Sequence, residues 1–204
     1  IPLRLVGSEM CIRDRMNSTT FSIANLLSFL RLSLVPALVW LALEADADWF
    51  LVVLAVSLVS DILDGYLARK LNQVSDFGAK LDSWGDSLTY ASMIFGLYQI
   101  WPAIFTEQKA YLLSATLSFI IPLMFALKKF GEYPSYHTWG AKVAAVLIAP
   151  AYYMLILIDA DTWFRMVILF YLLVAAEEIL ITLILKSPAT NVSSAWRLIR
   201  RRDA

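Results

Sequence analysis

The sequence has few of the residues on which disulfide scaffolds, zinc sites and nucleic-acid interfaces depend. Its 204 residues include one cysteine, Cys11, and one histidine, His137, which excludes a disulfide framework and a cysteine- or histidine-rich metal cluster. Only 17% of the residues are charged, whereas a soluble domain has about a quarter. The formal net charge is zero, so bulk electrostatics indicate no nucleic-acid partner. Any chemistry must therefore rest on other side chains.

Hydrophobic residues are abundant instead, at 60% of the chain, with a mean hydropathy of +0.67. They gather in six runs of about 18 to 25 residues, near 21–43, 49–71, 77–101, 110–127, 141–158 and 163–185. At about 1.5 Å per residue, each run is long enough to cross a bilayer as a helix. The runs lack the period-two alternation of a membrane β-barrel. The sequence predicts an all-α integral membrane protein with six transmembrane helices, and a short loop flanked by Pro102 and Glu107.

Residues outside the runs predict how the chain is divided and oriented. Residues 1–15 have no sustained apolar run, and we expect a non-native or disordered prefix there, before a six-helix catalytic domain at 16–186. Lysines and arginines gather after the second and fourth runs and in the tail at 187–204, and such positive segments face the cytoplasm. We therefore expect a protein of the cytoplasmic membrane with both termini in the cytoplasm.

Four aspartates interrupt the second and third runs. Asp61 and Asp64 are three residues apart, and Asp82 and Asp86 are four apart, so each pair lies on one helical face. Asp76 falls outside this spacing and is expected to cap the third helix. A short turn makes the two helices antiparallel neighbours, so we expect the four carboxylates to converge near one end of the hairpin. Carboxylates are costly inside a membrane, and functional candidates for that reason.

The charge of this group predicts a metal site. Carboxylate oxygens prefer hard cations such as Mg²⁺, Mn²⁺ or Ca²⁺, and two divalent ions would neutralise four carboxylates. Two metal ions in one site suit in-line phosphoryl chemistry. Small residues at Gly65, Ala68 and Gly78 would leave a gap for a flat ligand beside the carboxylates, and Arg69 could fork onto a phosphate.

These residues form the pattern D-x2-D-G-x2-A-R-x8-G-x3-D-x3-D without a departure, at Asp61, Asp64, Gly65, Ala68, Arg69, Gly78, Asp82 and Asp86. The pattern resembles that of the CDP-alcohol phosphotransferases, also called CDP-alcohol phosphatidyltransferases, and the six-helix layout is similar over about 21–185. The resemblance implies a homodimeric enzyme of phospholipid synthesis. It would displace CMP from a CDP-lipid, with CDP-diacylglycerol as the expected donor, by means of a small alcohol.

The resemblance also implies residue roles. Asp61, Asp64 and Asp82 would hold two Mg²⁺ or Mn²⁺ ions, and Asp86 would be a shared ligand and the general base. The CDP moiety would be bound by Asp61 together with Gly65, Ala68, Arg69 and Gly78.

The acceptor is less well determined by the sequence. The stretch N-L-L-S-F-L-R ends at Arg31 and resembles an entry found in family members that make phosphatidylglycerophosphate, with Ala24 where a proline is common. Arg31 would reach the acceptor or snorkel to lipid phosphate. Lys142 would bind an acceptor phosphate or anchor a positive loop. Family members that make phosphatidylglycerophosphate tend to have G-K with a threonine nearby, whereas this sequence has G-A-K followed by valine. Glycerol 3-phosphate is the favoured acceptor; inositol phosphate, serine and other polyols stay open.

Two other classes of protein also use intramembrane or clustered carboxylates. A cation or proton transporter could also have carboxylates within its helices, but it would not need the small residues and the arginine beside them. A prenyl-type synthase would be soluble with a DDxxD-like run, which the sequence lacks. His137 and Tyr136 are expected to pack in a loop, and Glu177 and Glu178 have no assigned role.

Overall fold

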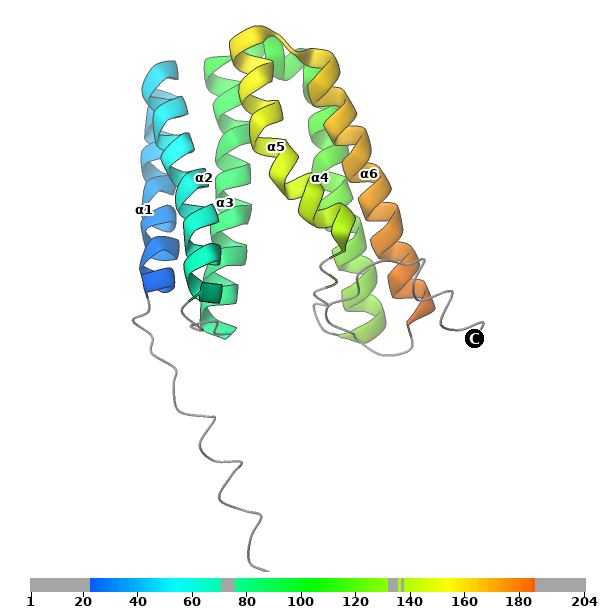
Figure 1. The fold of residues 1–204 in the computed structure, drawn as a ribbon. Helices are drawn as coiled ribbons and strands as arrows, with labels where there is room; N and C mark the ends of the chain where they lie inside the picture. The colour runs from blue at the N-terminus through cyan, green and yellow to red at the C-terminus, as the bar shows by residue number, and fades with distance from the viewer. Residues whose placement is uncertain (1–22, 71–75, 132–135, 137, 186–204) are drawn as a thin grey trace, which may run out of the picture. The chain divides into compact units, whose positions relative to one another are not determined.

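The computed structural model describes residues 23–70, 76–131, 136 and 138–185, which form six α-helices and their flanks (Figure 1). The helices are α1 (Ile23–Leu43), α2 (Ala47–Lys70), α3 (Asp76–Ile100), α4 (Pro102–Phe130), α5 (Trp139–Ile158) and α6 (Asp161–Ile184). No strand occurs among these described residues. The predicted all-α fold with six helices is therefore confirmed.

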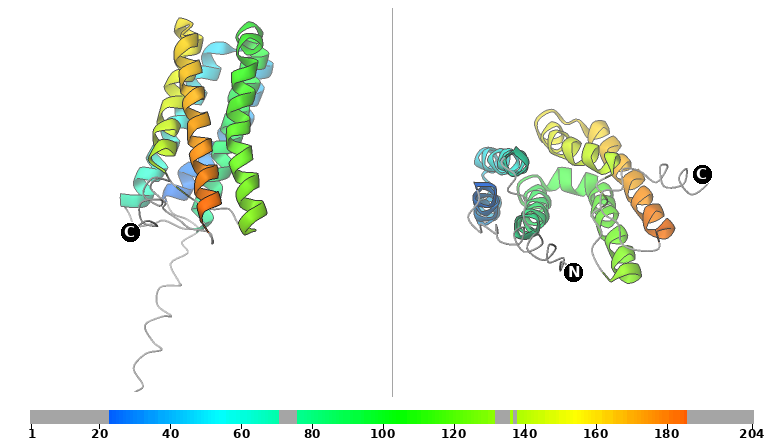
Figure 2. Two further views of the ribbon diagram at one scale, coloured as in Figure 1. Left: turned by 90° about the vertical axis from the view of Figure 1, so that its right-hand side faces the viewer. Right: turned by 60° about the horizontal axis from the view of Figure 1, so that its bottom comes forward.

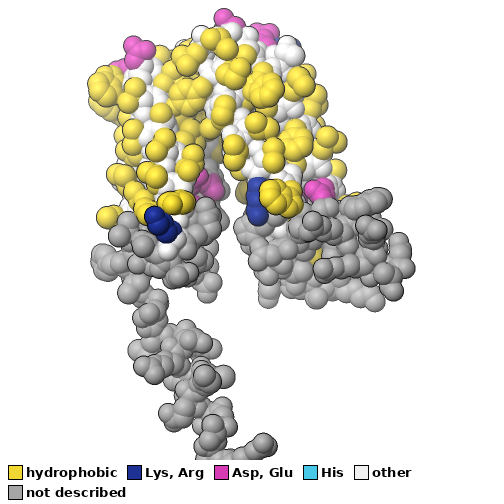
Figure 3. Space-filling model, in the orientation of Figure 1, with side chains coloured by type: hydrophobic (Ala, Val, Ile, Leu, Met, Phe, Trp, Pro, Cys, Tyr) yellow, Lys and Arg dark blue, Asp and Glu magenta, His cyan; other side chains and the backbone are white. Residues whose placement is uncertain are grey.

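Four helices of the described chain are long and apolar enough to cross a membrane on their own composition. They are α1, over Leu26–Leu43, and α4, α5 and α6, with mean hydropathies between 2.0 and 2.4. The other two helices, α2 and α3, contain the aspartates of the motif. Hydrophobic side chains cover most of the helix sides visible in Figure 3, and charged ones lie mainly toward helix ends. This distribution is that of an integral membrane protein.

Helix α4 is longer than the sequence predicted, because it begins at Pro102 instead of near Ala110. A proline is well tolerated in the first turn of a helix, where its missing N–H would have no partner. The polar residues after it are part of the helix, and Gln108 is fully buried. Its Oε1 accepts a hydrogen bond from Nε of Arg165 on α6 at 3.0 Å. The predicted loop around Pro102 is therefore wrong, since tertiary contacts stabilise a polar helical turn there.

Two compact units make up the chain, residues 1–102 and 103–204, and each is described by itself. In the first unit, α1 packs along both α2 and α3, which contact each other much less (Figures 1 and 2). The sequence predicted α2 and α3 as direct neighbours because a short turn joins them. In the structure α1 is their main packing partner.

The interior of the first unit has an apolar layer and a polar layer. Near the end of α1, the buried apolar side chains are Leu38, Leu41, Ala42, Phe50, Leu54, Met93 and Leu97. Toward the start of α1, the buried side chains are polar: Ser28, Arg31, Ser57, Ser60, Asp64, Thr89 and Ser92. Burying polar groups is costly unless they are paired, so the second layer depends on the apolar layer for stability.

In the second unit, α4 is tied to α6 near both ends. Arg165 of α6 binds Gln108, as described, and its Nη2 also lies 3.2 Å from a carboxylate oxygen of Glu107. At the other end, Nζ of Lys129 donates to the backbone carbonyls of Thr182 and Leu183 at 2.8 and 2.9 Å. Those carbonyls lie in the last turn of α6, where a positive charge stabilises the helix end.

The close approach of α3 to α2 at Gly96 generates a stability prediction. A Cβ added to Gly96 would meet the ring of Phe50. We expect Gly96→Ala to lower the free energy of unfolding by about 1–3 kcal/mol, because a filled core accepts extra atoms only with strain. Thermal unfolding in detergent measures the loss. In a Phe50→Leu background the penalty of Gly96→Ala should shrink, and an equal penalty in both backgrounds would contradict this account.

Candidate active site

The structure brings three of the four motif aspartates together. Asp61 and Asp64 on α2 and Asp82 on α3 each offer a carboxylate oxygen, and these oxygens lie within 4.8 Å of one another. Asp64 is buried, whereas Asp61 and Asp82 are partly exposed. We call these three side chains, with Asp86 beside them, the carboxylate cluster.

A buried arginine from α1 lies in the middle of the carboxylate cluster. Nη1 of Arg31 contacts the carboxylates of Asp61 and Asp86, the latter at 3.2 Å. Its Nη2 lies 3.0 Å from the carboxylate of Asp82 and donates to the backbone carbonyl of the same residue at 2.7 Å. The side chain of Arg31 is only 1% exposed. A charge this far from water needs such close partners, and the planar guanidinium can serve several carboxylates at once.

This position decides against one of the two roles expected for Arg31. Snorkelling would carry the guanidinium along the helix surface to the lipid headgroups. Instead the side chain points into the first unit and pairs with aspartates of two other helices. Contact with the acceptor stays a prediction.

Asp64 is held by a different residue of α1. Oγ of Ser28 donates a hydrogen bond to Oδ2 of Asp64 at 2.8 Å, and both side chains are buried. Ser28 lies one helical turn before Arg31, so one face of α1 serves both aspartates of α2. The sequence contained this signal in the three-residue spacing of Ser28 and Arg31, but no role was assigned to the serine.

Gly85 is a second residue that sequence reasoning missed. It lies on α3 between Asp82 and Asp86, and a Cβ added there would meet the guanidinium of Arg31. The glycine therefore leaves the space in which Arg31 lies against α3. Its position in S-W-G-D, one residue before Asp86, was the only signal in the sequence.

The cluster has a buried side and an open side. Asp64 is 5% exposed, whereas Asp86 is 62% exposed. The end of α2 and the start of α3 carry the cluster, and residues near the start of α1 contact it (Figure 1). The exposed carboxylates can therefore meet a ligand without a change of fold.

The remaining predicted residues lie in less informative places. Gly65, Ala68 and Arg69 belong to the last turns of α2, but their side chains are outside the described residues, as is His137. Gly78 lies in the first turn of α3. These glycines and the alanine thus belong to the end of α2 and the start of α3, the helix ends that carry the cluster.

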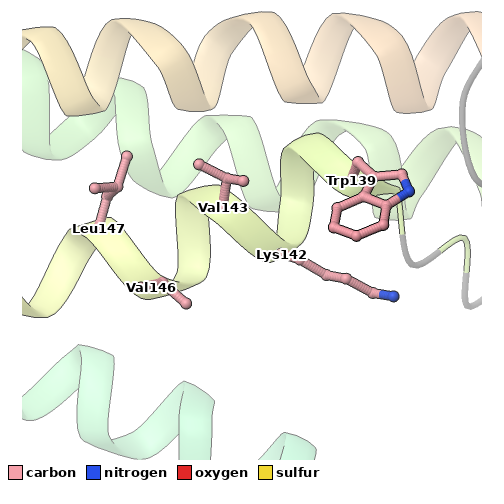
Figure 4. A pocket seen from close by; sticks show the side chains of 5 residues that line it. All are labelled: Trp139, Lys142, Val143, Val146 and Leu147. Carbon is pink, nitrogen blue, oxygen red and sulfur yellow. The ribbon is translucent and has the colours of Figure 1, made fainter.

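Lys142 belongs to the second unit, in the first turns of α5. Its Nζ lies 5.6 Å from the ring centroid of Trp139, and Figure 4 shows both side chains beside a hollow along α5. The other residues that line it are Val143, Val146 and Leu147. Lys142 is thus a cation on an otherwise apolar surface, which suits a lipid headgroup or an anionic acceptor equally.

The carboxylate cluster fits divalent cations. Mg²⁺ takes oxygen ligands at about 2.1 Å, so opposite ligands of one ion are about 4 Å apart. The 4.8 Å spread of the three oxygens is close to this value. Four carboxylates and one guanidinium sum to a charge of −3, which attracts cations strongly where water is scarce.

Such a cluster in an all-helical membrane protein suits a membrane enzyme that acts on phosphorylated substrates with divalent cations. More particularly, the chain belongs to the CDP-alcohol phosphatidyltransferase family, whose family model matches residues 21–186. The resemblance of the motif to this family is therefore confirmed. Members use a CDP-lipid donor, an alcohol acceptor and divalent metal ions, so the chain is a transferase of phospholipid synthesis, and the transporter and prenyl-synthase alternatives fall away.

Individual relatives divide between two named activities. A Streptomyces coelicolor "Cardiolipin synthase (CMP-forming)" is 34% identical over 148 residues, which is 70% of this chain and 68% of that protein. The human "Cardiolipin synthase (CMP-forming)" is 39% identical over 84 residues, covering 36% and 28%. An Aquifex aeolicus "CDP-diacylglycerol--glycerol-3-phosphate 3-phosphatidyltransferase" is 35% identical over 120 residues, covering 56% and 65%. No solved structure matches the chain.

The buried contact between Ser28 and Asp64 generates a second stability prediction. Ser28→Ala removes a hydrogen bond to a buried carboxylate, so we expect the free energy of unfolding to fall by about 1.5–3 kcal/mol. Thermal unfolding without added divalent cations measures the effect. The matched control is Ser33→Ala, because Ser33 is exposed on the same helix and donates only to the carbonyl of Leu30. Equal losses in the two variants would refute the role of Ser28.

Proposed function

We propose that the chain transfers the phosphatidyl group of CDP-diacylglycerol to an alcohol that carries a glycerol unit, and releases CMP. The observation that carries the proposal is the carboxylate cluster in a chain of this family. The relatives' names support the donor and the leaving group, since two of those named above are CMP-forming and another acts on CDP-diacylglycerol.

Within the cluster, Asp61, Asp64 and Asp82 would hold two divalent ions, either Mg²⁺ or Mn²⁺, with Asp86 as a shared ligand. When bound, such ions neutralise the pyrophosphate and stabilise the departing CMP. The cytidine nucleotide would lie against the helix ends at Gly65, Ala68 and Gly78. Arg69 would bind one of its phosphates, and Asp61 would also contact the CDP moiety. The small residue types at these positions of the sequence support this arrangement.

The reaction is a displacement at phosphorus. The acceptor hydroxyl oxygen attacks the phosphorus that carries the diacylglycerol, a new P–O bond forms, and the bond from that phosphorus to CMP breaks. Asp86 takes the proton of the attacking hydroxyl. Its exposure supports this role, because a general base must meet an incoming hydroxyl, whereas the buried Asp64 is better suited to holding a cation.

For the acceptor, we propose phosphatidylglycerol first. The Streptomyces coelicolor relative, which matches over the largest share of this chain among the three described, is named for making cardiolipin. Cardiolipin results when a phosphatidyl group joins the free glycerol hydroxyl of phosphatidylglycerol. Glycerol 3-phosphate, which the sequence favoured, is the second candidate, and the name of the Aquifex aeolicus relative supports it. Lys142 would suit the phosphate of either acceptor.

The membrane arrangement belongs to the same proposal. Positive charges in the last turns of α2 and α4, such as Lys70, Lys128 and Lys129, favour a cytoplasmic site in the cytoplasmic membrane. Acyl chains would then stay in the bilayer while the nucleotide meets water at the helix ends. A homodimer stays an expectation from the family.

An acceptor panel tests the reaction. Purified protein with CDP-diacylglycerol and Mg²⁺ should release CMP when phosphatidylglycerol is added, and cardiolipin should appear in equal amount. CMP release with glycerol 3-phosphate alone would replace phosphatidylglycerol by the second candidate. No CMP release with any acceptor, including inositol phosphate and serine, would overturn the proposed function.

The role of Asp86 predicts a separable defect. Asp86→Asn keeps the shape of the side chain but cannot accept the proton, so we expect the rate of CMP release to fall by roughly 10²- to 10⁴-fold. Binding of the CDP-lipid, measured by equilibrium dialysis, should change little by comparison. The control is Asp48→Asn, in the first turn of α2 at the opposite helix end, which should leave the rate unchanged. A rate close to the wild-type value in Asp86→Asn would exclude the general-base role.

A further inference from the structure

Arg31 takes no part in the roles proposed for the four aspartates, although it contacts three of them. Asp61 and Asp82 belong to the group of oxygens that fits a divalent ion, and the carboxylates of both pair with Arg31. The guanidinium and a divalent cation therefore claim the same carboxylates. We propose that Arg31 is a positioning residue that acts as an internal competitor of the divalent cations and sets how tightly the cluster binds them.

The anchoring of Arg31 supports competition instead of simple displacement. Nη2 donates to the backbone carbonyl of Asp82 at 2.7 Å, and this bond does not depend on the carboxylates. Gly85 leaves the space in which the guanidinium lies, and the side chain is almost fully buried. Arg31 can therefore stay near the cluster when cations bind to the carboxylates. A fixed positive charge a few ångströms away then opposes every cation that enters.

The same contact would preserve the geometry of the cluster before cations bind. Bare carboxylates this close repel one another, and one guanidinium between them reduces that repulsion. Arg31 thus links α1 to α2 and α3 at the helix ends where the apolar layer no longer holds them. The expected cost is weaker cation binding, and the expected gain is a cluster that keeps its shape while a cation enters or leaves. This inference rests on the divalent site of the proposed function.

Cation affinity is the test, because a merely structural arginine would not set it. In the full-length chain, Arg31→Met keeps an unbranched, flexible side chain, shorter than that of arginine, and removes the charge. At pH 8, free Mn²⁺ is followed by electron paramagnetic resonance during titration of the purified protein. We expect Arg31→Met to bind Mn²⁺ about tenfold more tightly than the wild type, because a nearby like charge is removed. Its thermal stability should be lower without cations and should rise more when Mn²⁺ is added. Unchanged or weaker Mn²⁺ affinity would overturn the proposal.

Two further variants sharpen the result. Arg165→Met removes an arginine that pairs with Glu107 and Asp161 in the second unit, and its Mn²⁺ affinity should equal that of the wild type. Gly85→Ala keeps the charge of Arg31 but displaces its guanidinium, so Mn²⁺ binding should tighten there too, by less than in Arg31→Met. This variant decides the question if Arg31→Met does not fold, and an unchanged affinity in it would then count against competition.

These measurements separate a failure of the role proposed for Arg31 from a failure of the proposed reaction. Mg²⁺-dependent CMP release by the wild type, with unchanged Mn²⁺ affinity in Arg31→Met, would overturn only the role of Arg31. Tighter Mn²⁺ binding by Arg31→Met, with no CMP release from the wild type on any acceptor, would support the role of Arg31 and overturn the proposed reaction. An effect of Arg31→Met on the KM of the acceptor alone would identify an acceptor contact and refute competition.

Discussion

The ion pairs between Arg31 and the aspartates of α2 and α3 are the interaction on which the candidate site depends. One guanidinium contacts Asp61, Asp82 and Asp86, and it is almost completely removed from water. Carboxylates within a membrane protein repel one another and lose hydration, so they need a nearby cation to stay together. The packing of α1 along both α2 and α3 brings Arg31 to these carboxylates, and Gly85 leaves the space for its guanidinium.

The first unit separates stability from chemistry along its length. Its apolar layer, which includes Leu38, Phe50 and Leu97, buries hydrocarbon at one end of the helices. Its polar layer holds Ser28, Arg31 and the carboxylates at the other end, where part of the cluster is exposed. Because burial of polar groups is costly, the second layer is tolerable only while the first holds the helices together. A donor with acyl chains and a charged head suits that division.

Much of the fold and part of the site could be predicted from the sequence. The six long apolar runs correctly predicted six helices. The motif of spaced aspartates correctly indicated the family, and three of its four carboxylates lie together in the structure. The start of α4 was misplaced because the contact that stabilises its polar first turns comes from Arg165, 57 residues away from Gln108. Ser28 and Gly85 were missed because neither has a chemical signature by itself. Each matters only through a neighbour on another helix.

What the sequence by itself determined are properties of single segments: helix length, apolar composition, and the face on which each pair of aspartates lies. These follow from the 1.5 Å rise and 3.6-residue repeat of one helix. Only the tertiary structure decided that α1 packs along both α2 and α3 and that Arg31 meets Asp82, 51 residues away. Helical periodicity gives the direction of a side chain from its own axis. It does not say which helix lies opposite, because that depends on the packing of all three.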